Sequence, residues 1–98
     1  MRVVTPRVLK EYSDRHAQAK IPLLLWYEVT KKASWKTLAD IKRDFNSVDY
    51  VGNSRFVFNI GGNNFRLIAI IIFASQKVYI RFIGTHAAYD KLKDASTV

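Results

Sequence analysis

The first half of the chain carries hydrophobic residues at helical spacing. A short strand is expected at residues 2–5, followed by a helix that begins at Pro6, because proline is well tolerated in the first turn of a helix. A second helix is expected to begin at Pro22. Its apolar stripe, beside Trp26, is expected to consist of Leu25, Val29 and Ala33.

A third, shorter helix is expected after Thr37. The segment from Thr37 to Asp40 has the form of a capping box, in which a threonine hydroxyl and a carboxylate three residues later each bond to the backbone N–H of the other. The buried face of this helix is expected to consist of Leu38, Ile41 and Phe45.

From Tyr50 onward the pattern changes to the alternation that is typical of strands. Three strands are expected, at residues 55–60, 65–73 and 77–83. The segment Gly61-Gly62-Asn63-Asn64 is a strong hairpin turn, because Gly and Asn accept the positive φ that such turns need. Residues 74–76 form a weaker turn. Gly84 is expected to end the last strand, and a short helix is expected at 87–93.

The first turn fixes the pairing of the strands on either side of it. If residues 62–63 are its centre, Asn59 lies opposite Arg66. A second two-residue turn, centred on residues 75–76, would place Thr85 opposite Arg66 as well. The sequence therefore predicts three polar side chains in one row at the same end of the sheet.

Alternation also sorts the strand residues into two faces. One face is apolar, is expected to pack against the helices, and comprises Phe56, Phe58, Ile60, Phe65, Leu67, Ala69, Ile71, Phe73, Val78, Ile80 and Phe82. The second face is mixed and comprises Arg55, Val57, Asn59, Arg66, Ile68, Ile70, Ile72, Tyr79, Arg81, Ile83 and Thr85. Polar chemistry is therefore expected on the second face. A shift of one residue at the second turn would move Arg81 and Thr85 from the second face to the first.

Length and charge narrow the class of protein. The chain has 98 residues, which suits one small domain spanning residues 1–98. It contains 16 Lys and Arg against 8 Asp and Glu, a formal net charge of +8, and so small and basic a protein attracts polyanions, nucleic acid first among them. It has no cysteine and no signal-peptide pattern, and its longest apolar run, Leu67 to Ala74, is too short to span a membrane. A cytoplasmic protein without membrane contact is expected.

Arg66 is the first candidate for chemistry. Arginine suits phosphate because its planar guanidinium donates paired hydrogen bonds and stays charged. Arg66 is expected among aliphatic neighbours, where an unpaired charge is costly. The alternative is a surface arginine paired with a carboxylate, although few acids fall near the strands: Asp49, Asp90 and Asp94.

His86 and Tyr89 are the next candidates. If a helix begins near His86, Tyr89 lies about one turn later and faces the same way. Histidine is well suited to proton transfer near neutral pH. The alternatives are a merely exposed histidine, as expected for His16, and a tyrosine of the core.

The remaining patterns are less specific. Lys42 and Arg43, with Lys31, Lys32 and Lys36 before them, either contact phosphates or form a solvated face. No metal site and no cofactor are expected, because the acids are scattered without a histidine cluster, and no nucleophile elbow or nucleotide-binding glycine pattern occurs.

Two segments resemble the HigB family of toxins. Residues 55–68, RFVFNIGGNNFRLI, are similar to the central hairpin of that family, and residues 79–91, YIRFIGTHAAYDK, to its last strand and its Gly-Thr-His-x-x-Tyr-Asp ending. The tract from Ala33 to Phe45 fits as well, and the similarity runs from Arg2 to about Lys91. The spacing Asn-x-x-x-Asn-x-x-Arg and the Thr-His-x-x-Tyr-Asp ending are specific in combination.

The resemblance implies a RelE-like α+β fold, with N-terminal helices packed on one face of a twisted antiparallel sheet and the RNA site on the other. It implies the toxin of a type II toxin–antitoxin system, a metal-independent endoribonuclease that cuts mRNA engaged by the ribosome. Its partner would be a helix-turn-helix antitoxin of the HigA type. The implied catalytic residues are Arg66, His86 and Tyr89, and which of the last two is acid or base stays open. RNA contacts are expected at Asn59, Asn63, Arg81, Thr85, Lys91, Lys42 and Arg43.

The expected reaction is attack by the RNA's own 2′-hydroxyl on the adjacent phosphorus, with Arg66, helped by Arg81, stabilising the charge. Two other functions fit the same composition. One is a non-catalytic RNA- or DNA-binding module, which would keep the basic charge without needing His86. The other is a protein-interaction domain whose basic surface meets an acidic partner.

Overall fold

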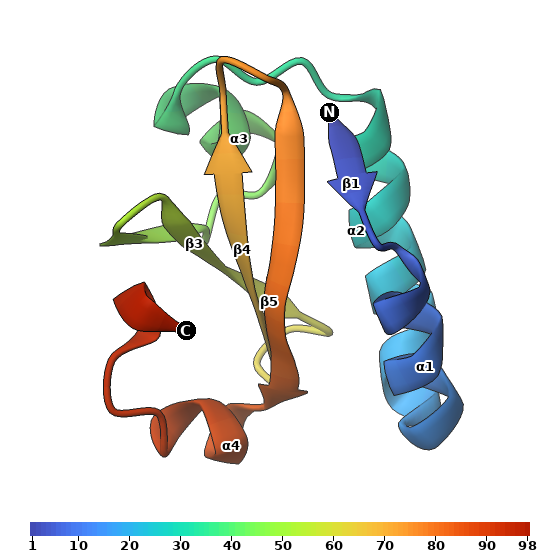
Figure 1. Ribbon diagram of the computed structural model, residues 1–98. Coiled ribbons are helices and arrows are strands. Elements are labelled where there is room, and N and C mark those ends of the chain that lie inside the picture. Colours follow the sequence, from blue (N-terminus) through green and yellow to red (C-terminus); the bar gives the residue numbers. More distant parts are fainter.

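Five strands form one sheet, and the helices from the first half of the chain cover one of its faces (Figure 1). The computed structural model describes residues 1–98. The strands are β1 (Arg2–Val4), β2 (Asp49–Gly52), β3 (Arg55–Ile60), β4 (Phe65–Ile72) and β5 (Lys77–Thr85), in the spatial order β1-β5-β4-β3-β2. The expected α+β class is confirmed. Because β1 runs parallel to β5, the sheet is mixed and not antiparallel throughout.

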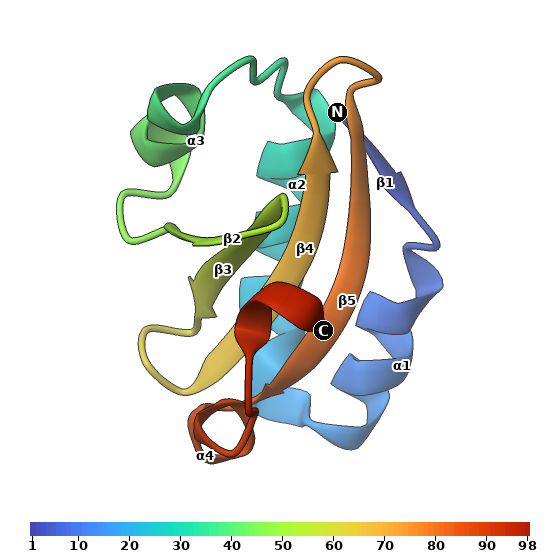
Figure 2. The same ribbon diagram turned by 60° about the vertical axis from the view of Figure 1, so that its left-hand side comes forward.

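The helices are distributed unequally over the two faces. They are α1 (Arg7–Arg15), α2 (Lys20–Lys32), α3 (Leu38–Asp44) and α4 (His86–Asp90), with short 3₁₀ turns at Ala17–Ala19 and Ala95–Thr97. Figure 2 shows α2 behind the sheet and the last turn of the chain in front of it. None of the helices has the length and apolar character needed to cross a membrane.

On β3 and β4, the helix-covered face of the sheet is the apolar face that alternation predicts. Its buried members include Phe58, Leu67 and Ile71, which join α2 and α3 residues in one hydrophobic cluster. Trp26 of α2 packs its ring edge to face against Phe58, with 5.5 Å between ring centroids. Burial of such large apolar side chains is the main source of stability for a sheet covered on one side by helices.

The prediction for α2 was wrong about which side of the helix is buried. Leu23, Trp26 and Thr30 face the sheet, whereas Leu25 and Val29 are 62% and 37% exposed. Successive residues point about 100° apart around a helix, so burying the bulky Trp26 turns its neighbour Leu25 outward.

The capping box before α3 is confirmed. The Thr37 side chain accepts from the backbone N–H of Asp40, and the Asp40 carboxylate accepts from the backbone N–H of Thr37. Ile41 is fully buried, and Leu38 and Phe45 pack against the core as expected.

The first hairpin has the predicted register, but the second does not. Asn59 lies opposite Arg66, as expected. Between β4 and β5, however, Ile72 pairs with Lys77, so the turn spans residues 73–76. Gln76 closes this turn with a φ of 57° and a side-chain amide that donates to the carbonyls of Phe73 and Trp35, at 2.9 and 2.7 Å. The bond to Trp35 is a tertiary contact that local turn rules do not include.

A bulge in β5 further changes which residues face which way. The pairing shifts between Ile68 and Ala69, which leaves Arg81 as the extra residue of β5. Arg66 therefore lies opposite Gly84, and Thr85 lies opposite Phe65. The predicted positions of three residues were consequently wrong: Phe82 is on the second face, and Ile83 and Thr85 are on the helix-covered face.

We call the second face the arginine face. It comprises Arg55, Val57, Asn59, Arg66, Ile68, Ile70, Tyr79 and Phe82, together with the bulge residue Arg81. The C-terminal part of the chain, with α4 and the turn Ala95–Thr97, contacts β2 to β5 on this side (Figure 2). β5 runs through Gly84, and α4 begins at His86, one residue before the expected helix. The edge strand β2 was not predicted.

Candidate active site

Arg66 lies nearly buried at the hairpin end of the arginine face, with 9% of its surface exposed. Its Nη1 donates to the carbonyls of Asn63 and Phe65 at 3.3 and 3.2 Å, and its Nη2 donates to Asn63 Oδ1 at 3.3 Å. No carboxylate lies within ion-pair distance of Arg66. The alternative of a surface ion pair is thus contradicted, and a nearly buried guanidinium is left with only neutral acceptors.

The short helix α4 brings Tyr89 to this guanidinium. The Arg66 Cζ lies 5.9 Å from the centroid of the Tyr89 ring, in the range of a cation–π contact. The helix is fixed beside the hairpin because the backbone N–H of His86 donates to the carbonyl of Asn64 at 3.1 Å. The three candidate catalytic residues, Arg66, His86 and Tyr89, therefore gather around one turn.

His86 has a carboxylate partner that the sequence analysis missed. Its Nδ1 lies 2.8 Å from Asp90 Oδ2, one helical turn further on, and both side chains are about half exposed. The i, i+4 spacing of His86 and Asp90 in the expected helix was the signal that could have found this pair. When Nδ1 carries the proton that Asp90 accepts, Nε2 is the nitrogen left to take up or release a proton.

Thr85 does not lie opposite Arg66 as expected and has a structural role instead. Its hydroxyl accepts from the backbone N–H of Ala88 at 3.1 Å and so caps α4. Gly84, which does lie opposite Arg66, leaves room for the Phe82 ring, since a Cβ at Gly84 would lie 2.5 Å from Phe82 Cζ. An aromatic ring therefore occupies the space expected for the threonine.

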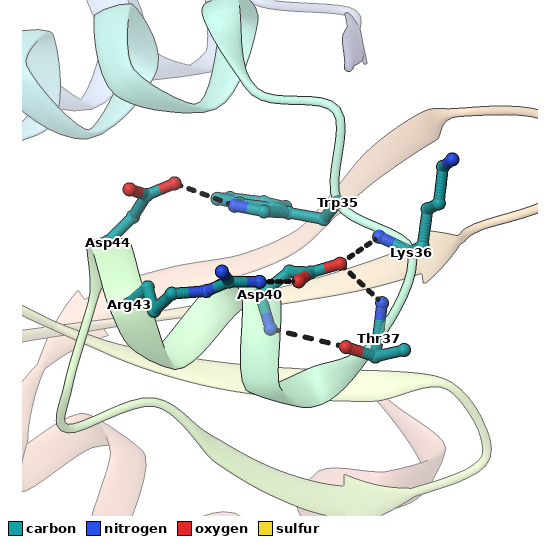
Figure 3. Close-up of polar contacts among 6 residues, drawn as sticks. All are labelled: Trp35, Lys36, Thr37, Asp40, Arg43 and Asp44. Carbon is teal, nitrogen blue, oxygen red and sulfur yellow. Dashed lines mark hydrogen bonds and ion pairs between the residues drawn. The ribbon is translucent and has the colours of Figure 1, made fainter.

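Asn59 links this cluster to a pocket formed with the end of α3. The pocket has a volume of about 330 Å³ and is lined by Arg43, Asp44, Phe45, Asn46, Ser47, Val48, Phe58 and Asn59. Figure 3 shows how its rim is held: Arg43 bonds to Asp40, and Asp44 accepts from Trp35 Nε1 at 2.8 Å. The pocket thus extends the polar site from Asn59 to the end of α3, with Arg43 held at its rim by a carboxylate.

The other residues that were expected to contact RNA lie in different environments. Asn63 orients Arg66 through its carbonyl and its side-chain oxygen. Lys42 on α3 and Lys91 just after α4 are exposed and make no ion pair. Arg81 Nε donates to the main-chain oxygen of Val98 at 3.2 Å.

His16 is not the merely exposed histidine that was expected. Its ring stacks on Tyr12 with 4.1 Å between centroids, and it packs edge-on toward Phe65 on the helix-covered face. Burial raises the pKa of Tyr12, against a smaller opposite effect of Arg15. His16 therefore belongs to the packing of α1 against the hairpin and not to the cluster around Arg66.

The arrangement around Arg66 suits chemistry on a phosphate. It combines a guanidinium without a counter-ion, a phenol beside that guanidinium and an imidazole oriented by a carboxylate. These supply stabilisation of developing negative charge and groups for proton transfer. The chain brings no three His, Asp or Glu side chains together in a group that could hold a metal ion.

Comparisons with known proteins agree with this chemistry. A family model described as the HigB toxin, a RelE-like toxic component of a toxin–antitoxin system, matches residues 19–92. The chain is 36% identical over 93 residues to the mRNA interferase toxin HigB of Escherichia coli (strain K12), which covers 92% of this chain and 88% of that protein. The mRNA interferase HigB of Shigella flexneri matches to the same extent. The mRNA interferase HigB of Escherichia coli O6:H1 is 29% identical over 94 residues, which covers 94% of this chain and 91% of that protein.

Proposed function

The chain belongs to the HigB family of RelE-like toxins, and from this membership we propose that it is a toxin that cleaves messenger RNA. The observation that carries the proposal is Arg66, nearly buried without an acidic partner and gathered with Tyr89 and the His86–Asp90 pair around one hairpin turn. Relatives named mRNA interferases favour cleavage over a non-catalytic nucleic-acid-binding module.

In the proposed reaction the 2′-oxygen of a nucleotide forms a bond to the adjacent phosphorus, and the bond from phosphorus to the 5′-oxygen of the next nucleotide breaks. The products are a 2′,3′-cyclic phosphate and a 5′-hydroxyl. One proton leaves the 2′-hydroxyl and one joins the departing 5′-oxygen, so the step needs a base and an acid but no outside reactant. Because the nucleophile belongs to the RNA, the reaction as proposed uses no metal ion.

Each residue of the cluster has a role in this reaction. Arg66, held in place by the carbonyl and side-chain oxygens of Asn63, donates to the phosphorane, a stabilisation typically worth roughly 3–4 kcal/mol per donor in such sites. His86 accepts the proton of the 2′-hydroxyl at Nε2 while Asp90 holds Nδ1, and Tyr89 donates to the 5′-oxygen. Asp90 is a positioning residue, because it acts through His86.

RNA is proposed to lie across the hairpin end of the arginine face. Asn59 and Asn63 offer amides beside the reacting phosphate, and the pocket at the end of α3 offers Arg43 to the neighbouring nucleotides. Lys42, Arg81 and Lys91 add positive charge around this path.

The partners proposed for the protein follow from its family. A toxin of this class is neutralised by an antitoxin, here proposed to be a helix-turn-helix protein of the HigA type. The substrate is proposed to be mRNA on the ribosome, which would place the protein in the cytoplasm. Growth and mRNA integrity on expression with and without the antitoxin test these assignments.

The decisive experiment compares two matched RNAs that differ only at the cleavage site. Substitution of one 2′-hydroxyl by hydrogen should abolish cleavage at that phosphate, because the nucleophile is lost, while cleavage elsewhere continues. Cleavage of the deoxy substrate at the same position would refute the mechanism. An absence of cleavage of both RNAs, with and without ribosomes, would refute the proposed activity itself.

A further inference from the structure

A second pair of arginines meets on the arginine face, away from the hairpin turn. Arg55 Nε and Nη2 donate to the main-chain oxygen of Val98 at 3.2 and 2.9 Å, and Arg81 Nε donates to the same oxygen at 3.2 Å. Three N–H donors from two different strands thus converge on one oxygen atom. The bulge in β5 makes this possible, because it adds Arg81 as an extra residue beside the row of Arg55 and Ile70.

The two guanidiniums have no negative partner among the side chains. Neither Arg55 nor Arg81 forms an ion pair with an Asp or Glu side chain, and the only other acceptor of Arg55 is the carbonyl of Asn53, at 3.0 Å from Nη1. Paired arginines that converge on one oxygen are suited to a phosphate, whose charge strengthens each hydrogen bond and whose second oxygen can bind the other side of the fork.

The segment that occupies this position is held by few contacts. Residues 94–98 contain no buried side chain. Apart from the arginines, the segment is tied to the sheet by one hydrogen bond, from Asn53 Nδ2 to the carbonyl of Ser96 at 3.1 Å. Its remaining hydrogen bonds are internal, from Ser96 and Thr97 to Asp94. A segment with no fully buried side chain and so few hydrogen bonds to the rest of the protein opens at low free-energy cost.

We propose that Arg55 and Arg81 form a second phosphate-binding site for the RNA strand, and that residues 94–98 occupy this site until RNA displaces them. The inference rests on the proposed function, since it assigns the ligand as a phosphodiester of the same RNA. Arg55 lies four residues along β3 from Asn59, a distance of about 13 Å in an extended strand. The site therefore takes a phosphate further along the RNA than the one that is cut.

Exchange of the segment for RNA is favoured by the number of oxygens that each ligand offers. The segment presents a single oxygen of Val98 to the arginines, whereas a phosphodiester presents two free oxygens that can bind both guanidiniums. While the segment covers the arginines, only the fraction of molecules with an open site binds RNA there, and this lowers the apparent affinity. Removing the segment should therefore raise the apparent affinity for RNA by the same factor.

The test uses a labelled RNA with 2′-O-methyl groups throughout, which the proposed reaction does not cleave, and measures binding by fluorescence anisotropy. A variant that ends at Lys93 should bind about threefold more tightly or better than the full chain. Arg55→Gln should weaken RNA binding more in this shortened variant than in the full chain. In the shortened variant Arg55 is free before RNA binds, whereas in the full chain it is bonded to the segment. Equal effects of Arg55→Gln in both backgrounds, or an unchanged affinity of the shortened variant, would overturn the proposal.

Two controls separate this effect from charge and from folding. Shortening the chain removes the charge of Asp94, so Arg7→Gln, which changes an exposed arginine of α1, is tested in both backgrounds and should have the same effect in each. Ser96→Pro keeps the length and the net charge but removes the N–H that donates to Asp94, and it should also tighten RNA binding. A Ser96→Pro variant that binds RNA no better than the full chain would count against displacement.

A phosphate titration tests the site independently of whether the protein cleaves RNA. Inorganic phosphate should shift the NMR resonances of Arg55 Nε and Arg81 Nε at lower concentration in the shortened variant than in the full chain. This outcome would support the site even for a protein that cleaves no RNA. Unchanged resonances in the shortened variant would overturn the site even for an active RNase.

Discussion

Arg66 shows most directly how a single residue can carry function in this protein. A nearly buried guanidinium with only carbonyl and amide acceptors is costly, because neutral oxygens compensate its lost hydration less well than a carboxylate would. Keeping acids away from Arg66 leaves its charge available to a phosphate. The contacts to Asn63 fix the guanidinium in place before the substrate arrives, which is the condition for effective electrostatic catalysis.

Replacing Arg66 by alanine should therefore slow cleavage by about 10²–10³-fold, the typical effect of losing one such donor. RNA affinity should fall much less, because many other Lys and Arg contribute to binding. Single-turnover cleavage and RNA binding are measured in parallel, with circular dichroism to establish that the fold is kept. Toxicity retained by Arg66→Ala at equal expression would contradict the assigned site.

The His86–Asp90 pair leads to a prediction about the rate of cleavage. His86→Ala should slow cleavage by about 10²–10⁴-fold, the usual range for a residue that transfers a proton. Asp90→Asn should cost about tenfold, the equivalent of one orienting hydrogen bond of roughly 1–1.5 kcal/mol, because Nδ1 of His86 loses the carboxylate that orients the ring. Single-turnover rates between pH 5 and 9 measure both effects.

The size of the His86 effect decides between catalysis and capping. A loss under about threefold with an unchanged pH profile would give His86 a structural role at the start of α4 and leave Tyr89 as the better candidate.

At the scale of single elements, α3 shows how local sequence can determine structure. Its capping box was predictable because the hydrogen bonds join residues three apart and need no tertiary contact. Backbone N–H groups of Lys36 and Thr37 and the side chain of Arg43 hold the pKa of Asp40 below its usual value (Figure 3).

The lowered pKa of Asp40 predicts how the stability of the protein varies with pH. A carboxylate whose pKa is lower in the folded state stabilises the fold above its unfolded pKa, and the contribution is lost as pH falls through the folded pKa. Asp40→Asn should therefore lower the free energy of unfolding at pH 7, and the difference from the unmodified protein should shrink below about pH 4. Urea denaturation across this range measures it, and a constant difference would show that Asp40 acts only through its neutral hydrogen bonds.

The strand β5 shows where sequence reasoning failed. The hairpin register at Asn59 and Arg66 was predictable because glycines and asparagines confine the turn. The next turn is closed by Gln76 through a tertiary bond to Trp35, and the register shift at Arg81 has no local signal in the sequence either. The prediction consequently failed for Phe82 and Thr85 on β5 while the candidates Arg66, His86 and Tyr89 still came together.

The two faces of the sheet differ in how their cations are partnered. On the helix side, three exposed cations form ion pairs, Arg7 with Glu11, Lys10 with Asp14, and Lys31 with Glu28, whereas the exposed Arg15, Lys20 and Lys32 form none. On the arginine face, Arg55, Arg66 and Arg81 form no ion pair with an Asp or Glu side chain. Three arginines without an acidic partner thus share the side where the candidate site lies, and such a cluster can attract a polyanion.

This asymmetry predicts how salt affects RNA binding. Each cation that contacts a phosphate of a single strand contributes about 0.7 to the slope of log affinity against log salt, because it releases a condensed counter-ion. The double variant Arg66→Gln, Arg81→Gln should lower that slope by about 1.4, whereas Lys10→Gln, Lys31→Gln removes the same charge from the helix side and should leave it nearly unchanged. Anisotropy with the uncleavable 2′-O-methyl RNA between 50 and 300 mM salt, roughly the range where such slopes are resolved, measures both. Equal slopes for the two double variants would mean that RNA is attracted by net charge alone. The arginine face would then not be the binding surface.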